Sequence, residues 1–160
     1  MKLYHGSDVI IDKPRIIESN RLTDFGRGFY VTSSFDQAMN WSKRVNRRNN
    51  TATGWVSNYD FDLKFAREKL VVLEFDGPCK EWLEFVVQNR RGVCTLEYDV
   101  VIGPVADDSV YEVVNLFQNG RYSVEQAVVM LKTEKLQDQY LFHTEQSLAF
   151  LSFTGSEEVS

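Results

Sequence analysis

The apolar runs of this chain are short, and this feature limits what the chain can fold into. Runs such as those at residues 70–73 and 100–102 have the length of a strand and fall far below the roughly 20 residues that cross a bilayer. Residues 1–5 contain no apolar signal region. We therefore expect a soluble, cytoplasmic protein without a membrane segment.

Strand and helix patterns alternate along the chain without a repeated βαβ rhythm. Alternating or β-branched residues predict strands at 2–5, 29–32, 55–61, 69–75, 98–102, 139–143 and 151–154. Helical spacing predicts helices at 35–48, 79–89, 110–117 and 124–132, with a helical turn at 145–150. Ser123 and Gln126 have the spacing of a capping box. We predict an α+β fold of mostly antiparallel strands with flanking helices, and a polar end at 155–160 that frays.

Length and charge exclude several classes of protein. The 160 residues predict one domain, residues 1–160. A net charge of −5 disfavours general nucleic-acid binding, because phosphate contacts need clustered cations. The two cysteines, Cys79 and Cys94, lack the spacing of a zinc site and are too few for a disulfide framework, so we expect reduced thiols and no metal.

One local cluster of cations runs against the overall charge. The predicted helix at 35–48 carries Lys43, Arg44, Arg47 and Arg48 on one side. A solvated helix face is the simplest interpretation. If the protein acts on RNA or DNA, this cluster is where the acceptor is expected to bind.

Candidate binding residues lie at the end of the first predicted strand. His5 ends the strand, Gly6 gives a ligand room to approach the backbone, and Ser7 adds a small donor. His143 has no glycine or nucleophile beside it, so we expect a structural role for it. The sequence therefore places the first candidate site around residues 5–7.

A second candidate region is the glycine-punctuated strand entry at residues 25–30. It matches neither a dinucleotide-binding GxGxxG nor a Walker loop. Tyr30 within it and Trp41 in the following helix are each compatible with core packing. As a pair they are also compatible with clamping a flat ring such as nicotinamide or a nucleobase.

Taken together and in order, these segments resemble the NAD-binding half of ADP-ribosyltransferases. The resemblance is to the diphtheria-toxin and poly(ADP-ribose) polymerase branch, and it rests on His5-Gly6-Ser7, residues 26–32 and residues 36–41, with Tyr30 and Trp41 11 positions apart. Over nearly its full length the chain is also similar to a bacterial family of unknown function in that clan, through LYHGS, DFGRGFY, YDVVIGP and FHTE. The resemblance implies a fold of split sheets.

The resemblance also implies NAD as the co-substrate and assigns roles to residues. His5 would bind the adenosine-side ribose. The Gly6 backbone would pair with the nicotinamide carboxamide, with Ser7 assisting. Tyr30 and Trp41 would sandwich the nicotinamide ring.

Arg27 has two readings that both stay open. Its guanidinium either reaches the pyrophosphate of NAD or faces solvent at the strand entry.

Gln139 stands where the family has its catalytic Glu. A neutral amide can bond the ribose 2′-hydroxyl but offers no negative charge and takes no proton. Three readings stay open: Gln139 suffices for a slower transferase or NAD glycohydrolase, Asp138 or Glu145 supplies the carboxylate, or the site binds NAD without turnover. The resemblance favours the first reading, since some toxin-type members of this fold work with Gln at that position. Strand alternation puts Asp138 on the face opposite Gln139, which argues against a simple exchange of the two.

The resemblance makes a mono-ADP-ribosyltransferase the expected function. It implies an intracellular bacterial toxin that modifies a protein or nucleic acid and is neutralised by a small cognate antitoxin. An NAD glycohydrolase, with water as the acceptor, and a non-catalytic NAD- or ADP-ribose-binding module are the alternatives. An interaction domain without a nucleotide site is the plainest one.

Overall fold

The computed structural model describes residues 1–18, 22–93, 97–106, 108–132 and 136–160. Within them the chain forms six helices and seven strands. In chain order these are β1 (Lys2–Ser7), β2 (Phe29–Val31), α1 (Phe35–Asn49), β3 (Gly54–Phe61), α2 (Leu63–Lys69), β4 (Val72–Glu74), α3 (Lys80–Arg90), β5 (Val100–Pro104), α4 (Asp108–Gln118), α5 (Val124–Lys132), β6 (Asp138–Phe142), α6 (Glu145–Leu148) and β7 (Leu151–Val159).

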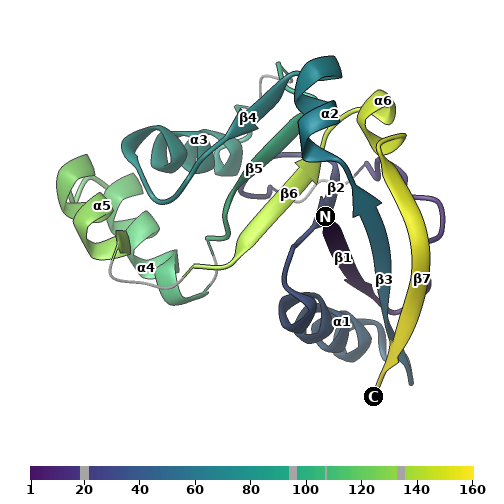
Figure 1. Ribbon diagram of the computed structural model, residues 1–160. Coiled ribbons are helices and arrows are strands. Elements are labelled where there is room, and N and C mark those ends of the chain that lie inside the picture. Colours follow the sequence, from purple (N-terminus) through teal and green to yellow (C-terminus); the bar gives the residue numbers. More distant parts are fainter. Residues whose placement is uncertain (19–21, 94–96, 107, 133–135) are drawn as a thin grey trace.

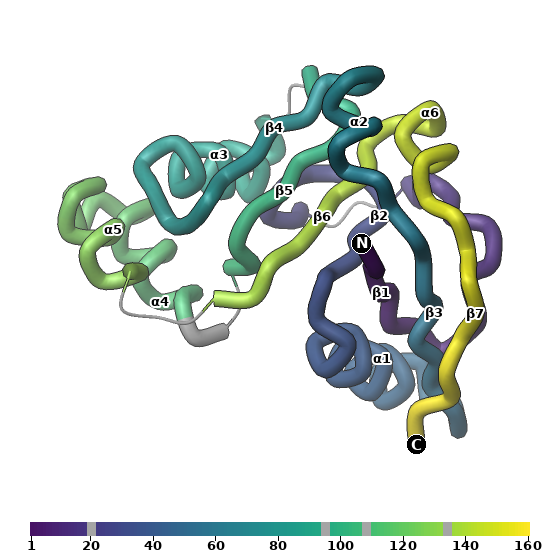
Figure 2. The backbone as a smooth tube through the Cα atoms, viewed as in Figure 1, coloured from purple at the N-terminus to yellow at the C-terminus, as the bar shows by residue number. Residues whose placement is uncertain are grey.

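The strands form two sheets, ordered β1-β3-β7 and β2-β6-β5-β4. Every pairing is antiparallel except that of β4 with β5. The two sheets meet where β1 lies beside β2, through a single bridge between Tyr4 and Thr32. Figure 2 shows β1 between β3 and β2. The predicted α+β class with mostly antiparallel strands is confirmed.

Each sheet buries side chains on both faces. One core lies between the sheets and includes Leu3, Phe29, Tyr59, Phe61 and Phe142. A second core joins the other face of β5 and β6 to α3, α4 and α5, which gather on one side of the molecule in Figure 1. The outer face of β1 and β3 is covered by α1, through Ala38 and Val45.

The helix boundaries follow local capping chemistry. Ser34 accepts a hydrogen bond from Gln37 N at the start of α1, which satisfies an amide that has no partner within the helix. The predicted capping box at α5 is confirmed: Ser123 N donates to Gln126 Oε1 at 2.9 Å, and Gln126 N donates to Ser123 Oγ at 3.2 Å.

Two predicted segments are wrong. Residues 69–75 are not one buried strand, because Asp62 caps a helix that continues to Lys69 and leaves only the short edge strand β4. Val71 is accordingly 55% exposed. The polar end does not fray, because β7 continues to Val159 by backbone pairing with β3. At residues 155–159 long-range pairing overrides local composition, whereas at residues 63–69 the local cap at Asp62 decides the structure.

The thiol, metal and membrane expectations have these outcomes. Cys79 is a free thiol at the N-cap of α3, and Cys94 lies outside the described residues. The described residues contain no group of three or more His, Cys, Asp or Glu placed to hold a metal ion. No helix in the described part of the chain is long and apolar enough to cross a membrane.

Candidate functional site

Two predicted site residues, His5 and Gly6, and the Tyr30 carbonyl lie at the place where β1 and β2 separate. Tyr4 N donates to Thr32 O at 2.8 Å, and Thr32 N donates to Tyr4 O at 3.0 Å. Beyond this bridge the strands diverge, and we call the space between residues 4–6 and residues 30–32 the fork. Backbone groups of an antiparallel strand point to alternate edges. Gly6 therefore points its N–H and C=O to the same edge as Tyr4, into the fork and away from β3.

His5 reaches into the fork from β1. Its Nδ1 lies 2.7 Å from Tyr30 O, and its ring stacks on Phe29 with centroids 4.4 Å apart. A carbonyl oxygen only accepts, so Nδ1 carries the proton of this bond. Burial lowers the pKa of His5 more than the bond to Tyr30 raises it. At neutral pH the imidazole is thus uncharged, and its Nε2 offers a lone pair to a donor.

Gly6 is required for the packing of α1. A Cβ at this position would stand 1.9 Å from Ala38 O and 2.8 Å from Ser42 N. No substituted residue fits against that backbone without a shift of the helix. The sequence suggested that Gly6 makes room for a ligand, whereas the space its missing side chain leaves is taken by α1.

The Tyr30 hydroxyl is hydrogen-bonded to residues 23–26, which precede β2. Its Oη lies 2.6 Å from Gly26 O and 2.9 Å from Thr23 Oγ1, and it accepts from Phe25 N at 3.2 Å. The ring packs beside the core formed with α3, α4 and α5. The phenol therefore projects from the face of β2 opposite to Phe29 and the His5 ring, while the Tyr30 carbonyl meets His5 within the fork.

Trp41 is not a core residue, because 47% of it is exposed. Its position on α1 follows from Gln37, one turn earlier, whose Oε1 accepts from Thr32 Oγ1 at 3.0 Å. Residues four apart share a helix face. Trp41 thus shares the side of α1 that carries Gln37, and about half of it is accessible.

Gln139 shares a sheet face with Tyr30. Tyr30 lies opposite Leu141 across the β2–β6 pair, and Gln139 is two positions before Leu141 on β6. The side chain is buried, and its Nε2 finds no hydrogen-bond partner within the described structure. A buried unpaired amide is costly, so this donor is available to a ligand.

The Asp138 side chain points to the other face of β6, as strand alternation predicted, and it accepts hydrogen bonds from Thr32 and Ser33 there. Its Oδ1 accepts from Thr32 Oγ1 at 3.0 Å and Ser33 N at 2.9 Å, and its Oδ2 accepts from Ser33 Oγ. These bonds fix the turn between β2 and α1. Glu145 is exposed at the start of α6, beyond the opposite end of β6 from Gln139. Neither carboxylate lies where it could replace Gln139.

Ser7 and Arg27 make contacts outside the fork. Ser7 Oγ donates to Asp8 Oδ1 at 3.3 Å in a local turn. Arg27 Nη1 pairs with Glu18 Oε1 at 3.0 Å, and both side chains are exposed. The Arg27 side chain therefore faces solvent, which is one of the two readings its sequence position allowed.

His143 has the structural role that the sequence predicted. Its Nδ1 lies 2.7 Å from Arg27 O, its backbone N donates to Asp99 O at 2.8 Å, and the side chain is buried. Burial is the main cause that lowers the pKa of His143. The ring therefore fixes the backbone of residues 25–30, which we call the glycine segment, on the side opposite to His5.

Two aspartates that were not among the predicted site residues connect segments that lie far apart in the sequence. Asp99 accepts from Thr144 Oγ1 at 2.8 Å and from Val71 N at 2.9 Å. Asp24 pairs with Arg90 Nε at 2.9 Å and accepts from Ala106 N. The conspicuous position of both aspartates inside the DFGRGFY and YDVVIGP segments was the available signal.

Two surface hollows stand out on the described structure, and none of the seven predicted site residues lines either. One, of about 520 Å³, lies at the end of α1 and is lined by Lys43, Asn46, Arg47, Asn50, Thr51, Ala52 and Ser160. The other, of about 830 Å³, lies beside α2 and α6 and is lined by Met1, Asp60, Phe61, Asp62, Leu63, Phe65, Ala149, Phe150 and Ser152.

The chain was compared with known families and proteins. A family model described as "Protein of unknown function (DUF3990)" matches residues 1–153. The comparisons with curated proteins and with solved structures find no match.

Proposed function

The chain belongs to the DUF3990 family of proteins of unknown function, and we propose that it is an NAD-dependent mono-ADP-ribosyltransferase whose nicotinamide site is the fork between β1 and β2. The resemblance to ADP-ribosyltransferases suggests this activity. The backbone edge of Gly6 is the observation that carries it.

A strand edge with one free N–H and one free C=O is a complement to a primary amide. Gly6 points both groups into the fork, and outside the β1–β3 pairing no described residue bonds to them. The nicotinamide carboxamide has one acceptor and a donor pair, so it can bond both groups at once. That double bond would fix the ring orientation, which raises the rate of a step that depends on geometry.

The side chains around the fork supply matching chemistry. The neutral His5 offers Nε2 as an acceptor for a ribose hydroxyl. The accessible indole of Trp41 and the ring of Tyr30 are flat surfaces for the nicotinamide. Because Gly6 and Gln139 are buried, the proposal requires the Tyr30 loop to move when NAD enters.

Gln139 sets the expected rate. Its unpaired Nε2 and its Oε1 can bond the ribose 2′-hydroxyl. In the reaction the bond between the ribose C1′ and the nicotinamide nitrogen breaks, and nicotinamide leaves with the electron pair. An oxygen or nitrogen of the acceptor then bonds C1′ and releases its proton to solvent, since Gln139 takes none. Without a carboxylate beside the cationic transition state, we expect slow turnover.

An NAD glycohydrolase is the second candidate, and the neutral side chain of Gln139 favours it. A site without a general base activates no acceptor, so the abundant acceptor, water, competes well. The macromolecular acceptor, the toxin activity and a small antitoxin partner are proposed from the resemblance alone.

Nicotinamide release from NAD, followed by chromatography with and without cell lysate, tests the proposal. His5→Ala and Tyr30→Ala are expected to lower release by about a hundredfold or more, because both disturb substrate orientation. Tyr30→Phe is the matched control, since it keeps the ring and removes only the hydroxyl bonds. Gln139→Glu is expected to keep or raise release.

Unchanged release in both the His5→Ala and Tyr30→Ala variants would defeat the site assignment. No release by the unmodified protein, under conditions in which it is folded, would defeat the enzyme. Free ADP-ribose as the sole product would select the glycohydrolase.

A further inference from the structure

One segment of this acidic chain contains no acidic residue. The chain has 23 Asp and Glu, yet none occurs between Asp36 and Asp60. The same segment holds four cations within residues 43–48, namely Lys43, Arg44, Arg47 and Arg48. These residues occupy the last turns of α1.

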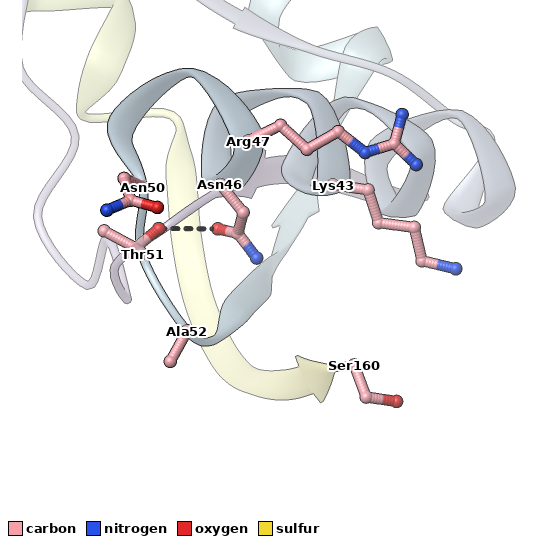
Figure 3. Close-up of a pocket in the computed structure, with 7 residues that line it drawn as sticks. All are labelled: Lys43, Asn46, Arg47, Asn50, Thr51, Ala52 and Ser160. Atoms are coloured by element: carbon pink, nitrogen blue, oxygen red, sulfur yellow. Dashed lines mark hydrogen bonds between the residues drawn. The ribbon is translucent and has the colours of Figure 1, made fainter.

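The four cations lie on the outward side of α1. The inward side packs on the sheet through Ala38, Ser42 and Val45. Lys43 and Arg47 are one turn apart, and both line the 520 Å³ hollow, where Figure 3 shows their side chains extended on the same side of the helix. Within the described residues, neither forms an ion pair or a side-chain hydrogen bond.

The rest of the hollow is lined by two amides, two hydroxyls and one alanine, namely Asn46, Asn50, Thr51, Ser160 and Ala52. Asn50 ends α1 in a left-handed conformation (φ 55°) and donates its N–H to Asn46 O. The side chains of Thr51 and Asn46 hydrogen-bond at 3.1 Å, as Figure 3 shows. Two cations without partners, together with amide donors and acceptors in a concave surface, suit a ligand that has both a phosphate and polar ring edges.

Within the described residues no acid pairs with Lys43 or Arg47. Asp36 lies in the first turn of α1, away from the four cations. Asp8 accepts from Asn49 Nδ2 at 2.9 Å, which is the main cause of its lowered pKa. The charge of Arg48 contributes to the lowered pKa of Asp8, so Asp8 offsets part of the Arg48 charge.

We propose that single-stranded nucleic acid docks on the α1 surface formed by Lys43, Arg44, Arg47 and Arg48, with a phosphate between Lys43 and Arg47. The hollow, of about 520 Å³, has a volume that is typical of a site for one small molecule. A single strand can place one nucleotide in it, whereas a duplex keeps its bases stacked inside the helix. The negative charge of the rest of the chain would orient the strand on this surface.

This docking stands without NAD chemistry. Its use as the acceptor of ADP-ribose rests on the proposed function.

The test is fluorescence anisotropy of the full chain with a labelled single-stranded RNA of mixed sequence and with the corresponding DNA. Arg47→Gln/Arg48→Gln is expected to weaken binding at least tenfold and to reduce the salt dependence, because phosphate contacts release counterions. Lys64→Gln/Lys69→Gln, which removes two exposed cations from α2, is the matched control and is expected to leave binding unchanged. Arg47→Lys/Arg48→Lys keeps the charge and is expected to restore binding.

Three results would overturn the proposal. The first is equal weakening by the α1 and α2 variants. The second is equal competition by a polyglutamate peptide, which would mark a site for acidic proteins. The third is no binding by the unmodified protein together with a lower melting temperature in the α1 variant, since these arginines would then only complement the helix dipole. Nicotinamide release without nucleic acid is expected to be unchanged in the α1 variant, so a failure of docking is distinct from a failure of the proposed enzyme.

Discussion

The two histidines make the same bond in two different surroundings. His5 Nδ1 and His143 Nδ1 each lie 2.7 Å from a backbone oxygen of the glycine segment, that of Tyr30 and that of Arg27. His143 is buried, and its backbone also bonds Asp99. His5 is only half-buried and lies at the fork beside the free edge of Gly6.

This difference shows that the bond alone does not define a role. In both cases the ring holds the glycine segment, so both residues contribute to folding. Only His5 lies where its second nitrogen meets an unpaired backbone edge. To separate a residue's structural role from its role in a site, the effect of its replacement on stability is compared with the effect on activity.

The largest expected effect concerns the glycines beside the two histidine contacts. A Cβ at Gly6 would meet Ala38 O at 1.9 Å, and one at Gly28 would meet Phe142 O at 2.3 Å. We expect Gly6→Ala and Gly28→Ala each to lower the free energy of unfolding by about 3 kcal/mol or more, because backbone must move. Urea denaturation measures this.

Gly77→Ala is the control for this pair, because a Cβ there has no atom within 4 Å. We expect it to change stability by less than about 0.5 kcal/mol. If Gly6→Ala were equally harmless, the close approach of α1 to β1 would be wrong.

Replacing the two histidines is expected to separate stability from activity. His143→Ala removes the bond to the Arg27 carbonyl and leaves a cavity where the buried ring lay, so it is expected to cost about 2–3 kcal/mol of unfolding free energy. His5→Ala is expected to cost about 1 kcal/mol, since the half-buried His5 side chain leaves a smaller cavity. Nicotinamide release should fall further in His5→Ala, despite its smaller stability loss. The reverse ranking in both measurements would break the comparison.

Mild acid is expected to destabilise the protein through these histidines. In the unfolded chain an imidazole takes up a proton near its ordinary pKa of about 6.5. Burial lowers the pKa of both His5 and His143 in the folded state. Below about pH 6.5 the unfolded state therefore binds more protons, so stability present at pH 7.5 is lost as the pH falls.

The urea midpoint at pH 7.5 and pH 5.5 checks this prediction. The drop between the two values should shrink in the His143→Ala variant. A free energy of unfolding that rises towards pH 5.5 would contradict this prediction, because the folded state would then stabilise the charged imidazole.

The smallest expected effect concerns the cap that follows His143. Thr144 caps α6 in a capping box with Ser147 and also donates to Asp99. Thr144→Ala is expected to cost about 1 kcal/mol of unfolding free energy without changing nicotinamide release. A loss of release in this variant would link the His143 side of the molecule to the fork.

The sequence predicted most of the elements because their signals are local. The capping box at Ser123 and the apolar spacing of α3 are examples. The end of β7 was missed because its state depends on pairing with β3, which no local pattern shows. Residues 69–75 were assigned wrongly because the cap at Asp62, which starts α2, was overlooked.

The candidate site was predictable in its members and not in its geometry. The sequence indicated His5, Gly6, Tyr30, Trp41 and Gln139 through motif order. It did not show that the His5 ring and the Tyr30 phenol lie on opposite faces of β2, because that depends on register across the bridge at Tyr4. The side-chain bonds of Asp138 were equally hidden.

The backbone amide of Gly6 gives the most direct test of the nicotinamide site. We suggest a titration of the ¹⁵N-labelled protein with NAD, followed by amide resonances and by free nicotinamide in the same sample. The account predicts that the Gly6 resonance shifts with NAD, that Gly77 does not, and that nicotinamide accumulates slowly. An unmoved Gly6 resonance at saturating NAD, with no nicotinamide formed, would contradict it.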